Sequence, residues 1–198
     1  IQTAAANTPR IEYATDGSLK GLLIESNRTN LITYSAASVA NWANASALSR
    51  TDSNENALGV FDGVIVAGNG SDWQGTNSPS FTTTNGVAYS VTAWIKKGTS
   101  PNFSVRLRDN TAASETRVEG AWGSSSLTTV QNAGAISNQS ITYITDTLAV
   151  VSFTVTRNST SNSTYIRIGP YTNTSGETII ALGAQVEVGG FPTSYIPT

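Results

Sequence analysis

The chain has 198 residues and a net charge of −2, and its length fits one large β-sandwich better than two domains. Charged residues make up 12% and hydrophobic residues 38%, and the weakly acidic balance excludes attraction of nucleic acid or anionic membrane by the charge of the whole chain. The absence of Cys and His excludes cysteine nucleophiles, Cys/His zinc sites, disulfides and histidine bases.

The first part of the chain predicts a linker followed by a hairpin. Residues 1–8 are small and polar, as is typical of a linker. In residues 9–29, two apolar runs flank Asp16-Gly17, a dipeptide that favours a tight hairpin turn. We therefore predict one β-sandwich domain over residues 9–198 that begins with this N-terminal hairpin. Because the chain starts with Ile and contains no Met, we expect it to be a piece of a longer protein.

Apolar and polar residues alternate in the middle of the chain. Residues 87–95 place Val, Tyr, Val, Ala and Ile on one face, and residues 103–107 do the same with Phe, Val and Leu. A period of two with a polar opposite face is typical of antiparallel strands. Further short strands are predicted at residues 30–35, 58–67, 115–122, 126–131, 141–145, 150–157, 165–169 and 178–188.

The strands are short and closely spaced, and Asn, Gly and Ser turns separate them. No convincing long helix interrupts them. This pattern predicts an all-β fold, a two-sheet antiparallel β-sandwich of the jelly-roll, concanavalin-like or galactose-binding-like type. Residues 189–198 contain two prolines and predict an extended C-terminal tail rather than a central strand.

The two ends of the chain carry long characteristic runs. The opening has Gly21-Leu-Leu-Ile-Glu25, and the close has Gly190-Phe-Pro-Thr-Ser-Tyr-Ile-Pro-Thr198. Both ends resemble the phage head-spike or tail-fibre domain family. The resemblance implies an adhesive, non-enzymatic role at a virion surface or outside the cell. In the parent assembly we expect a homo-oligomer, a trimer, with cell-surface or extracellular polysaccharide as partner. The charge and the apolar runs of the chain indicate neither nucleic acid nor membrane as a partner.

The middle of the chain is similar to jelly-roll carbohydrate-binding modules appended to xylanases and glucanases. The matching positions, in order, are Asn30-Leu31, Trp42, Trp73-Gln74, Tyr89 to Trp94, and Leu182 to Val188. That family often closes with an acidic pair that helps hold a structural calcium, and this chain has Gly183-Ala-Gln-Val-Glu187 instead. The departure puts the metal site in doubt. Four acidic residues remain as candidate calcium ligands: Glu25, Asp62, Asp72 and Glu187.

Sugar binding on a β-sandwich needs a flat aromatic ring with polar side chains around it. The alternation places Trp94 opposite the core set, so we expect Trp94 to be the platform unless a loop or a sister subunit covers it. Further candidates are Trp73, Trp122, Arg106, Arg108, Tyr165 and Arg167. The arginines suit an acidic or sulfated glycan if they cluster. Their alternative role is pairing with Glu115, Glu119 or Asp109.

Catalysis is not expected. Glycoside hydrolysis needs two carboxylates about 5 to 9 Å apart, and the acidic residues here are few and scattered. The sequence therefore predicts a non-catalytic carbohydrate-binding domain of a phage spike or fibre. Two alternatives stay open: a structural trimerisation or capping domain, whose residues 191–196 contact sister subunits, and a module appended to a polysaccharide-degrading enzyme.

Overall fold

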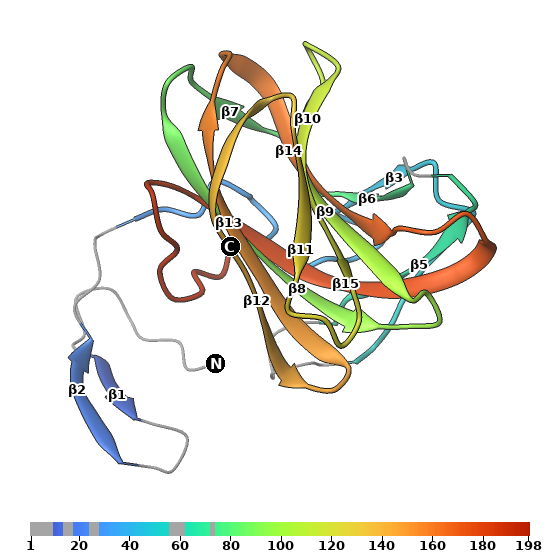
Figure 1. The fold of residues 1–198 in the computed structure, drawn as a ribbon, viewed down its shortest axis with the longest axis horizontal. Coiled ribbons are helices and arrows are strands. Elements are labelled where there is room, and N and C mark those ends of the chain that lie inside the picture. The colour runs from blue at the N-terminus through green and yellow to red at the C-terminus, as the bar shows by residue number, and fades with distance from the viewer. Residues whose placement is uncertain (1–9, 14–17, 24–27, 56–61, 72–73) are drawn as a thin grey trace.

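The computed structural model describes residues 10–13, 18–23, 28–55, 62–71 and 74–198, and these residues contain no helix. Two antiparallel sheets face each other with the hydrophobic core between them (Figure 1). The predicted all-β, two-sheet antiparallel sandwich is therefore confirmed. In the described parts of the chain, no helix has the length and apolar character needed to cross a membrane.

The first sheet, called the β9 sheet, places strands from the middle of the chain beside β14. Its order is β11 (Leu127–Gln131), β10 (Ser114–Ala121), β9 (Asn102–Asp109), β14 (Ser161–Pro170), β6 (Gly75–Asn77) and β3 (Ala43–Ala45), with β7 (Phe81–Thr83) also paired to β14. The second, called the β8 sheet, has the order β12 (Gly134–Thr145), β13 (Leu148–Arg157), β8 (Ala88–Lys97), β15 (Ser175–Val188), β5 (Val64–Asn69) and β4 (Ser49–Asp52). The chain passes repeatedly from one sheet to the other.

A separate two-stranded sheet lies at the N-terminal end. Strand β1 (Arg10–Tyr13) pairs antiparallel with β2 (Leu19–Leu23), and Arg10 lies opposite Leu23. Figure 1 shows this hairpin to one side of the sandwich. The Asp16-Gly17 turn predicted to close it lies outside the described residues.

The core contains the apolar sets that the alternation predicts. The β8 set is Tyr89, Val91, Ala93 and Ile95, and the β9 set is Phe103, Val105 and Leu107. Each fully buried Val, Leu, Ile or Phe side chain stabilises the fold by about 1.5 to 3 kcal/mol relative to an exposed one. The even positions of β8 and β9 consequently point to the two outer faces of the sandwich.

Two sequence predictions of strands need correction. Residues 30–35 form no regular strand: Leu31 N and Ser35 O bond to the backbone of β15, but between them the Asn30 side chain accepts hydrogen bonds from Ile32 N (3.1 Å) and Val186 N (3.1 Å) and interrupts the ladder. Strand β12 covers Gly134–Thr145 rather than residues 141–145 alone. Its first half is a largely exposed polar run on an edge strand, so it carries no hydrophobic period.

A buried ion pair joins the two sheets at one end of the core. Arg157, at the end of β13, places Nη2 2.6 Å from Asp109 Oδ2 at the end of β9, and both side chains are almost fully buried. The other carboxylate oxygen of Asp109 accepts hydrogen bonds from Thr111 N (2.9 Å) and Ala112 N (3.1 Å). Arg157 Nη1 also donates to Ala133 O at 2.7 Å. The pair therefore closes the β9–β10 turn and holds the start of β12.

The first prediction concerns this pair. Asp109→Asn leaves the Arg157 charge buried without its counterion, so we expect the free energy of unfolding to fall by about 3 to 5 kcal/mol. Guanidinium chloride denaturation measures the loss. The matched control is Glu55→Gln, which breaks the partly exposed pair with Lys96 and is expected to cost about 0 to 1 kcal/mol. Equal losses in the two variants would contradict the structural role of Asp109.

The second prediction concerns pH. Burial acts to raise the pKa of Asp109, but the Ala112 N–H, the Ser161 side chain and the Arg157 charge outweigh it, and the pKa is lowered. The pKa of Asp109 in the unfolded chain is about 3.9. The ionised carboxylate therefore makes its full contribution to the free energy of unfolding above that pH, and this contribution is lost as the pH falls through the lower pKa of the folded state. We expect the stability of Asp109→Asn to depend less steeply on pH below about 4 than that of the wild type. Urea denaturation across this range tests the slope, and parallel curves would contradict the assignment.

Candidate functional site

The outer face of the β9 sheet carries three arginines side by side. Strand register places Arg117 of β10 opposite Arg106 of β9, and Arg106 opposite Arg167 of β14. Like charges directly opposite each other on a sheet are destabilising. The outer face must therefore hold groups that offset this repulsion.

Glu115 supplies that offset. Its Oε1 lies 3.2 Å from Arg106 Nη1 and 2.8 Å from Arg117 Nη1, and its Oε2 lies 3.3 Å from Arg108 Nη1. Arg117 Nε also donates to Glu119. The Glu115 side chain is 3% exposed, and that of Arg106 is fully buried beneath its neighbours. We call this set the polar face: Arg106, Arg108, Glu115, Arg117, Glu119, Tyr165 and Arg167.

The electrostatics of the polar face follow from burial and crowding. Burial lowers the pKa of the Arg106 guanidinium, Glu115 raises it, and the charges of Arg117 and Arg167 lower it further. The pKa of Arg167 is lowered first by burial, and Arg108 adds to the shift. Arginine nevertheless stays protonated in proteins. The face is thus a cluster of fixed positive charges around a buried carboxylate.

Hydrogen bonds also fix the β14 side of the polar face. Arg167 Nε donates to Asn77 Oδ1 (2.9 Å) on β6, and its Nη2 donates to the Tyr165 hydroxyl (3.3 Å). The guanidinium carbon of Arg167 lies 5.7 Å from the centre of the Tyr165 ring. These contacts orient Arg167 before any ligand arrives.

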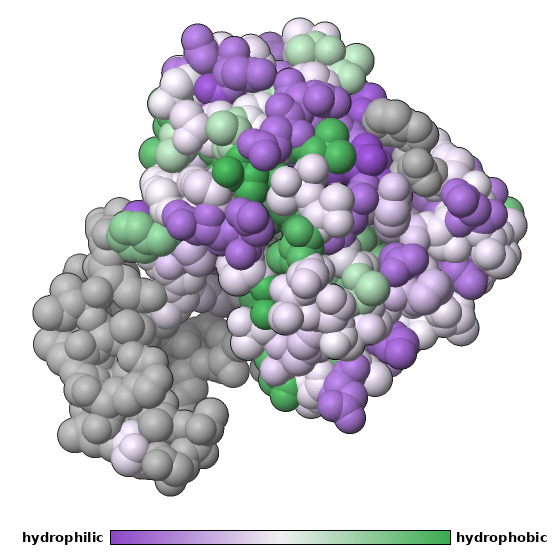
Figure 2. All heavy atoms as spheres, in the orientation of Figure 1, coloured by the Kyte–Doolittle hydropathy of each residue, from purple (hydrophilic) through white to green (hydrophobic). Residues whose placement is uncertain are grey.

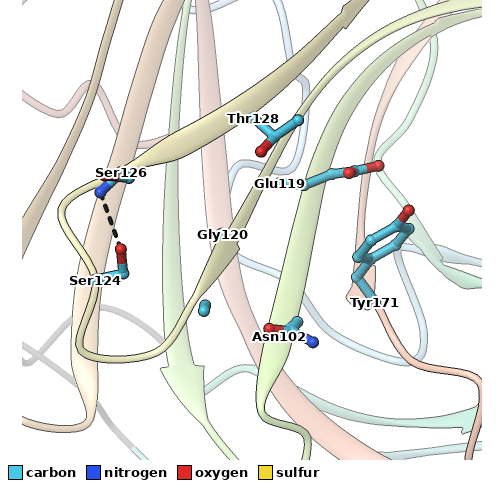
Figure 3. Close-up of a pocket in the computed structure, with 8 residues that line it drawn as sticks. Asn102, Glu119, Gly120, Ser124, Ser126, Thr128 and Tyr171 are labelled. Carbon is cyan, nitrogen blue, oxygen red and sulfur yellow. Dashed lines mark hydrogen bonds between the residues drawn. The ribbon is translucent and has the colours of Figure 1, made fainter.

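A pocket of about 260 Å³ opens beside the polar face (Figure 3). Figure 3 shows Glu119, Asn102 and Tyr171 around the space, with the Ser124–Ser126 turn beyond them. The polar and aromatic lining residues are Asn102, Glu119, Ser124, Ser126, Thr128 and Tyr171. A second pocket of about 280 Å³ shares Asn102 and Tyr171 with the first and extends along Thr172 and Asn173. Tyr171 and Asn102 therefore form the wall between two adjoining hollows.

Tyr171 is the aromatic residue of this site, and the sequence predictions missed it. Its backbone N–H donates to Asn102 O (3.2 Å), and the guanidinium carbon of Arg117 lies 5.9 Å from its ring centre. The residue follows Pro170 at the end of β14, where the two-residue alternation has stopped. The one signal in the sequence is an aromatic residue just beyond a strand end, which is too common to single out.

The arginine candidates meet on one face, and the tryptophan candidates do not join them. Arg106, Arg108, Tyr165 and Arg167 all lie on the polar face. The alternative role expected for the arginines also holds in part, because Glu115 and Glu119 pair with members of the cluster. Asp109 does not join them, since it pairs with Arg157 at the core.

Trp94 does not present an open platform, and the alternative that the sequence left open, a segment that covers the ring, is what the structure shows. Trp94 lies on the outer face of the β8 sheet, as the alternation predicts, but it is only 6% exposed. The Tyr195 ring of the C-terminal tail covers it at a centroid distance of 5.0 Å in an edge-on arrangement. Leu148, Ile180 and Leu182 complete this second apolar cluster. The C-terminal tail therefore covers the apolar cluster on the outer face of the β8 sheet.

The other two tryptophan candidates have different outcomes. Trp122 is half-buried at the edge of the core, where its ring lies 5.2 Å from that of Phe103 and 6.3 Å from that of Tyr143. It therefore serves as packing between the two sheets in this structure. Trp73 lies outside the described residues.

Polar contacts hold the tail on the β8 sheet. Gln185 donates to Ser194 O (3.2 Å) and to Glu187 Oε2 (2.8 Å), and Glu187 accepts a hydrogen bond from Thr193 N (2.9 Å). The Tyr195 hydroxyl lies 2.7 Å from Ser35 Oγ. The closing run of the chain is thus a strap fixed by buried polar side chains.

The candidate calcium ligands are only partly described. Glu25 and Asp72 lie outside the described residues, Asp62 is exposed, and Glu187 is buried with its carboxylate engaged by Thr193. Among the residues that the structure describes, no three or more Asp, Glu, His or Cys side chains gather as a metal site. Calcium binding stays a prediction, because half of its candidate ligands are not described.

Comparison with solved structures returns carbohydrate-binding modules. The first is the CBM22-1 and GH10 modules of endo-1,4-beta-D-xylanase 10B from Clostridium thermocellum in complex with xylohexaose, with 17% identity and a TM-score of 0.47 over 81% of this chain and 28% of that one. The second is the CBM22-1 xylan-binding domain of Xyn10C from Paenibacillus barcinonensis, with 11% identity and a TM-score of 0.49 over 83% of this chain and 97% of that one. At this level the likeness carries no conclusion about ligand. No family model and no curated protein matches the chain.

The third prediction tests the strap. Tyr195→Ala removes the ring that covers Trp94, so we expect acrylamide to quench the tryptophan fluorescence more strongly than in the wild type. The increase is expected to vanish in a Trp94→Phe background, which assigns it to that ring. Tyr171→Ala, on the other sheet, is the matched control and leaves the quenching unchanged. Unaltered quenching in Tyr195→Ala would show that the tail does not shield Trp94.

Proposed function

We propose that this protein is a non-catalytic polysaccharide-binding domain that holds its ligand along the outer face of the β9 sheet. The observation that carries the proposal is the Tyr171 ring, which stands between two adjoining hollows beside Glu119 and Asn102. Sugar sites on proteins combine an aromatic ring for the apolar face of the pyranose with planar polar groups for its hydroxyls. Tyr171 supplies the first of these, and the Asn102 amide and Glu119 carboxylate supply the second.

The surroundings of the pocket suit a hydroxyl-rich ligand. Ser124, Ser126 and Thr128 line one side with exposed or half-exposed hydroxyl groups. On the side of the molecule shown in Figure 2, hydrophobic residues form small separate patches among polar ones. A ligand here would exchange hydrogen bonds with water for hydrogen bonds with protein. This favours a sugar chain over an apolar partner.

The proposal excludes hydrolysis on a physical ground. Glycosidases need two carboxylates that face the scissile bond. On the polar face, Glu115 is buried beneath the guanidinium groups of Arg106, Arg108 and Arg117. Of the acidic residues that the structure describes, only Glu119 lines the pocket. A single accessible carboxylate can bind a hydroxyl group of a sugar. It cannot act both as the general acid and as the nucleophile or base that glycoside hydrolysis requires.

The setting of the domain is also a proposal. The ends of the chain resemble a phage spike or fibre family, which would place the domain at a virion surface and outside the cell. Attachment to a polysaccharide-degrading enzyme is the alternative, and a catalytic domain elsewhere in the parent chain would favour it. The structural trimerisation alternative expected residues 191–196 to contact sister subunits. Tyr195 and Ile196 bind Trp94, Ser35 and Gln185 of their own chain, whereas Phe191 is exposed, and the trimerisation alternative stays a prediction.

The fourth prediction tests the binding face. Tyr171→Ala removes the stacking ring, so we expect affinity for polysaccharide to fall about tenfold or more, because stacked aromatic groups contribute about 1 kcal/mol or more beyond their buried area. Affinity electrophoresis against a panel of plant, bacterial and host polysaccharides, xylan among them, identifies a ligand and measures the loss. Trp94→Phe is the control and keeps full binding, because that ring lies under the tail. Loss of binding in the control but not in Tyr171→Ala would move the site to the other sheet.

A further inference from the structure

We propose that the polysaccharide bound at this face carries acidic groups, that Arg117 binds them beside the Tyr171 pocket, and that Arg108 binds them further along the same face. This inference rests on the proposed function and names the class of its ligand. The acidic group is a carboxylate or a sulfate on the sugar. Both are planar or compact anions that accept paired hydrogen bonds from a guanidinium.

Arg117 links the sugar pocket to the row of arginines. It uses Nη1 for Glu115 and Nε for Glu119, and its guanidinium faces the Tyr171 ring. Within the described residues, no protein group bonds its Nη2, and that atom is not among the buried polar atoms that lack a partner. The Nη2 hydrogens are therefore directed to solvent at the edge of the pocket. A sugar stacked on Tyr171 would bring a substituent within their reach.

The exposed fraction of each arginine side chain indicates which of them a ligand can contact. The side chains of Arg117 and Arg108 are 16% and 17% exposed, whereas that of Arg106 is fully buried. Arg106 thus forms the floor, and the other two present their outer edges. Glu115 lies beneath them and fixes both guanidinium groups through its two oxygens. A donor pair held in this way loses little conformational freedom when an anion binds.

The charge of the face supports an anion. Its described residues include four arginines and two glutamates: Arg106, Arg108, Arg117, Arg167, Glu115 and Glu119. The lowered pKa values of Arg106 and Arg167 reflect, after burial, the mutual repulsion of these charges. An incoming carboxylate or sulfate would relieve part of that repulsion. The whole chain is weakly acidic, so this preference is local to the face.

Matched pairs of polysaccharides test the inference with the intact protein. One pair is polygalacturonate and its fully methyl-esterified form, which share a backbone and differ in the carboxylate. The other is dextran sulfate and dextran. Isothermal titration calorimetry is expected to show about tenfold tighter binding of the charged member of at least one pair at about 0.01 M salt, and a much smaller difference at about 1 M salt, where charges are screened. The pair that responds identifies the acidic group.

Variants assign the effect to the named side chains. Arg108→Gln and Arg117→Gln are each expected to remove most of the preference for the charged member, and Arg108→Gln is expected to leave binding of its neutral partner within about twofold. Lys97→Gln removes one positive charge from the exposed end of β8 and is expected to keep the preference. Because Arg117 also stabilises Glu115 and Glu119, its variant is first checked for a wild-type melting transition. If Arg117→Gln does not fold, the Arg108→Gln variant and the salt series test whether the arginines bind the acidic group.

The outcomes separate this inference from the proposed function. If the protein binds the charged and neutral members of each pair equally, and Tyr171→Ala weakens both, the preference for acidic groups is contradicted. The proposed binding of polysaccharide then still stands. A preference for the charged member that Lys97→Gln removes as fully as Arg108→Gln overturns the assignment to this face. No binding of any polysaccharide overturns both.

Discussion

The outer face of the β9 sheet depends on the buried carboxylate of Glu115. Strand register forces Arg117, Arg106 and Arg167 into one row, and without an internal anion these charges would push the three strands apart. Glu115 offsets this by bonding three guanidinium groups at once. Burying such a cluster is costly, and breaking it is costlier, because the remaining charges lose their partners. The arrangement therefore makes more sense as a preformed binding surface than as a source of stability.

The two sheets treat their outer faces in opposite ways. The β8 sheet has an apolar outer cluster around Trp94 and Leu182, and the chain covers it with its own tail. Gln185 and Glu187 bond to Ser194 O and Thr193 N of the tail, whereas the buried hydroxyl groups of Ser90 and Thr92 on the same face have no partner among the described residues. The β9 sheet instead leaves charged and polar groups along an open pocket. An aromatic ring beside fixed hydrogen-bonding groups is thus found at the pocket next to the β9 sheet.

The sequence predicts local features of this molecule well and long-range ones poorly. The alternation in β8 and β9 identifies both the core residues and the residues of the outer faces, because a strand has a strict period of two. The extended tail also follows from its prolines, but its position over Trp94 depends on contacts with distant residues such as Ser35. The arginine row arises from pairing β9 with β14, which no local pattern encodes. Tyr171 falls beyond the end of a strand, where periodicity says nothing.

Local geometry rather than total charge decides what this face attracts. At physiological ionic strength the Debye length is about 8 Å, so a bound group senses the charges of its immediate neighbours and little of the rest of the chain. The net charge of −2 is therefore no obstacle to an acidic ligand at the row of arginines. At the pocket itself Glu119 brings a negative charge close to the ligand, and neutral hydroxyl groups suit that position best. A sugar chain that presents hydroxyls at one unit and an acid at the next meets both conditions, because Arg117 contacts Glu119 and faces Tyr171 at the same time.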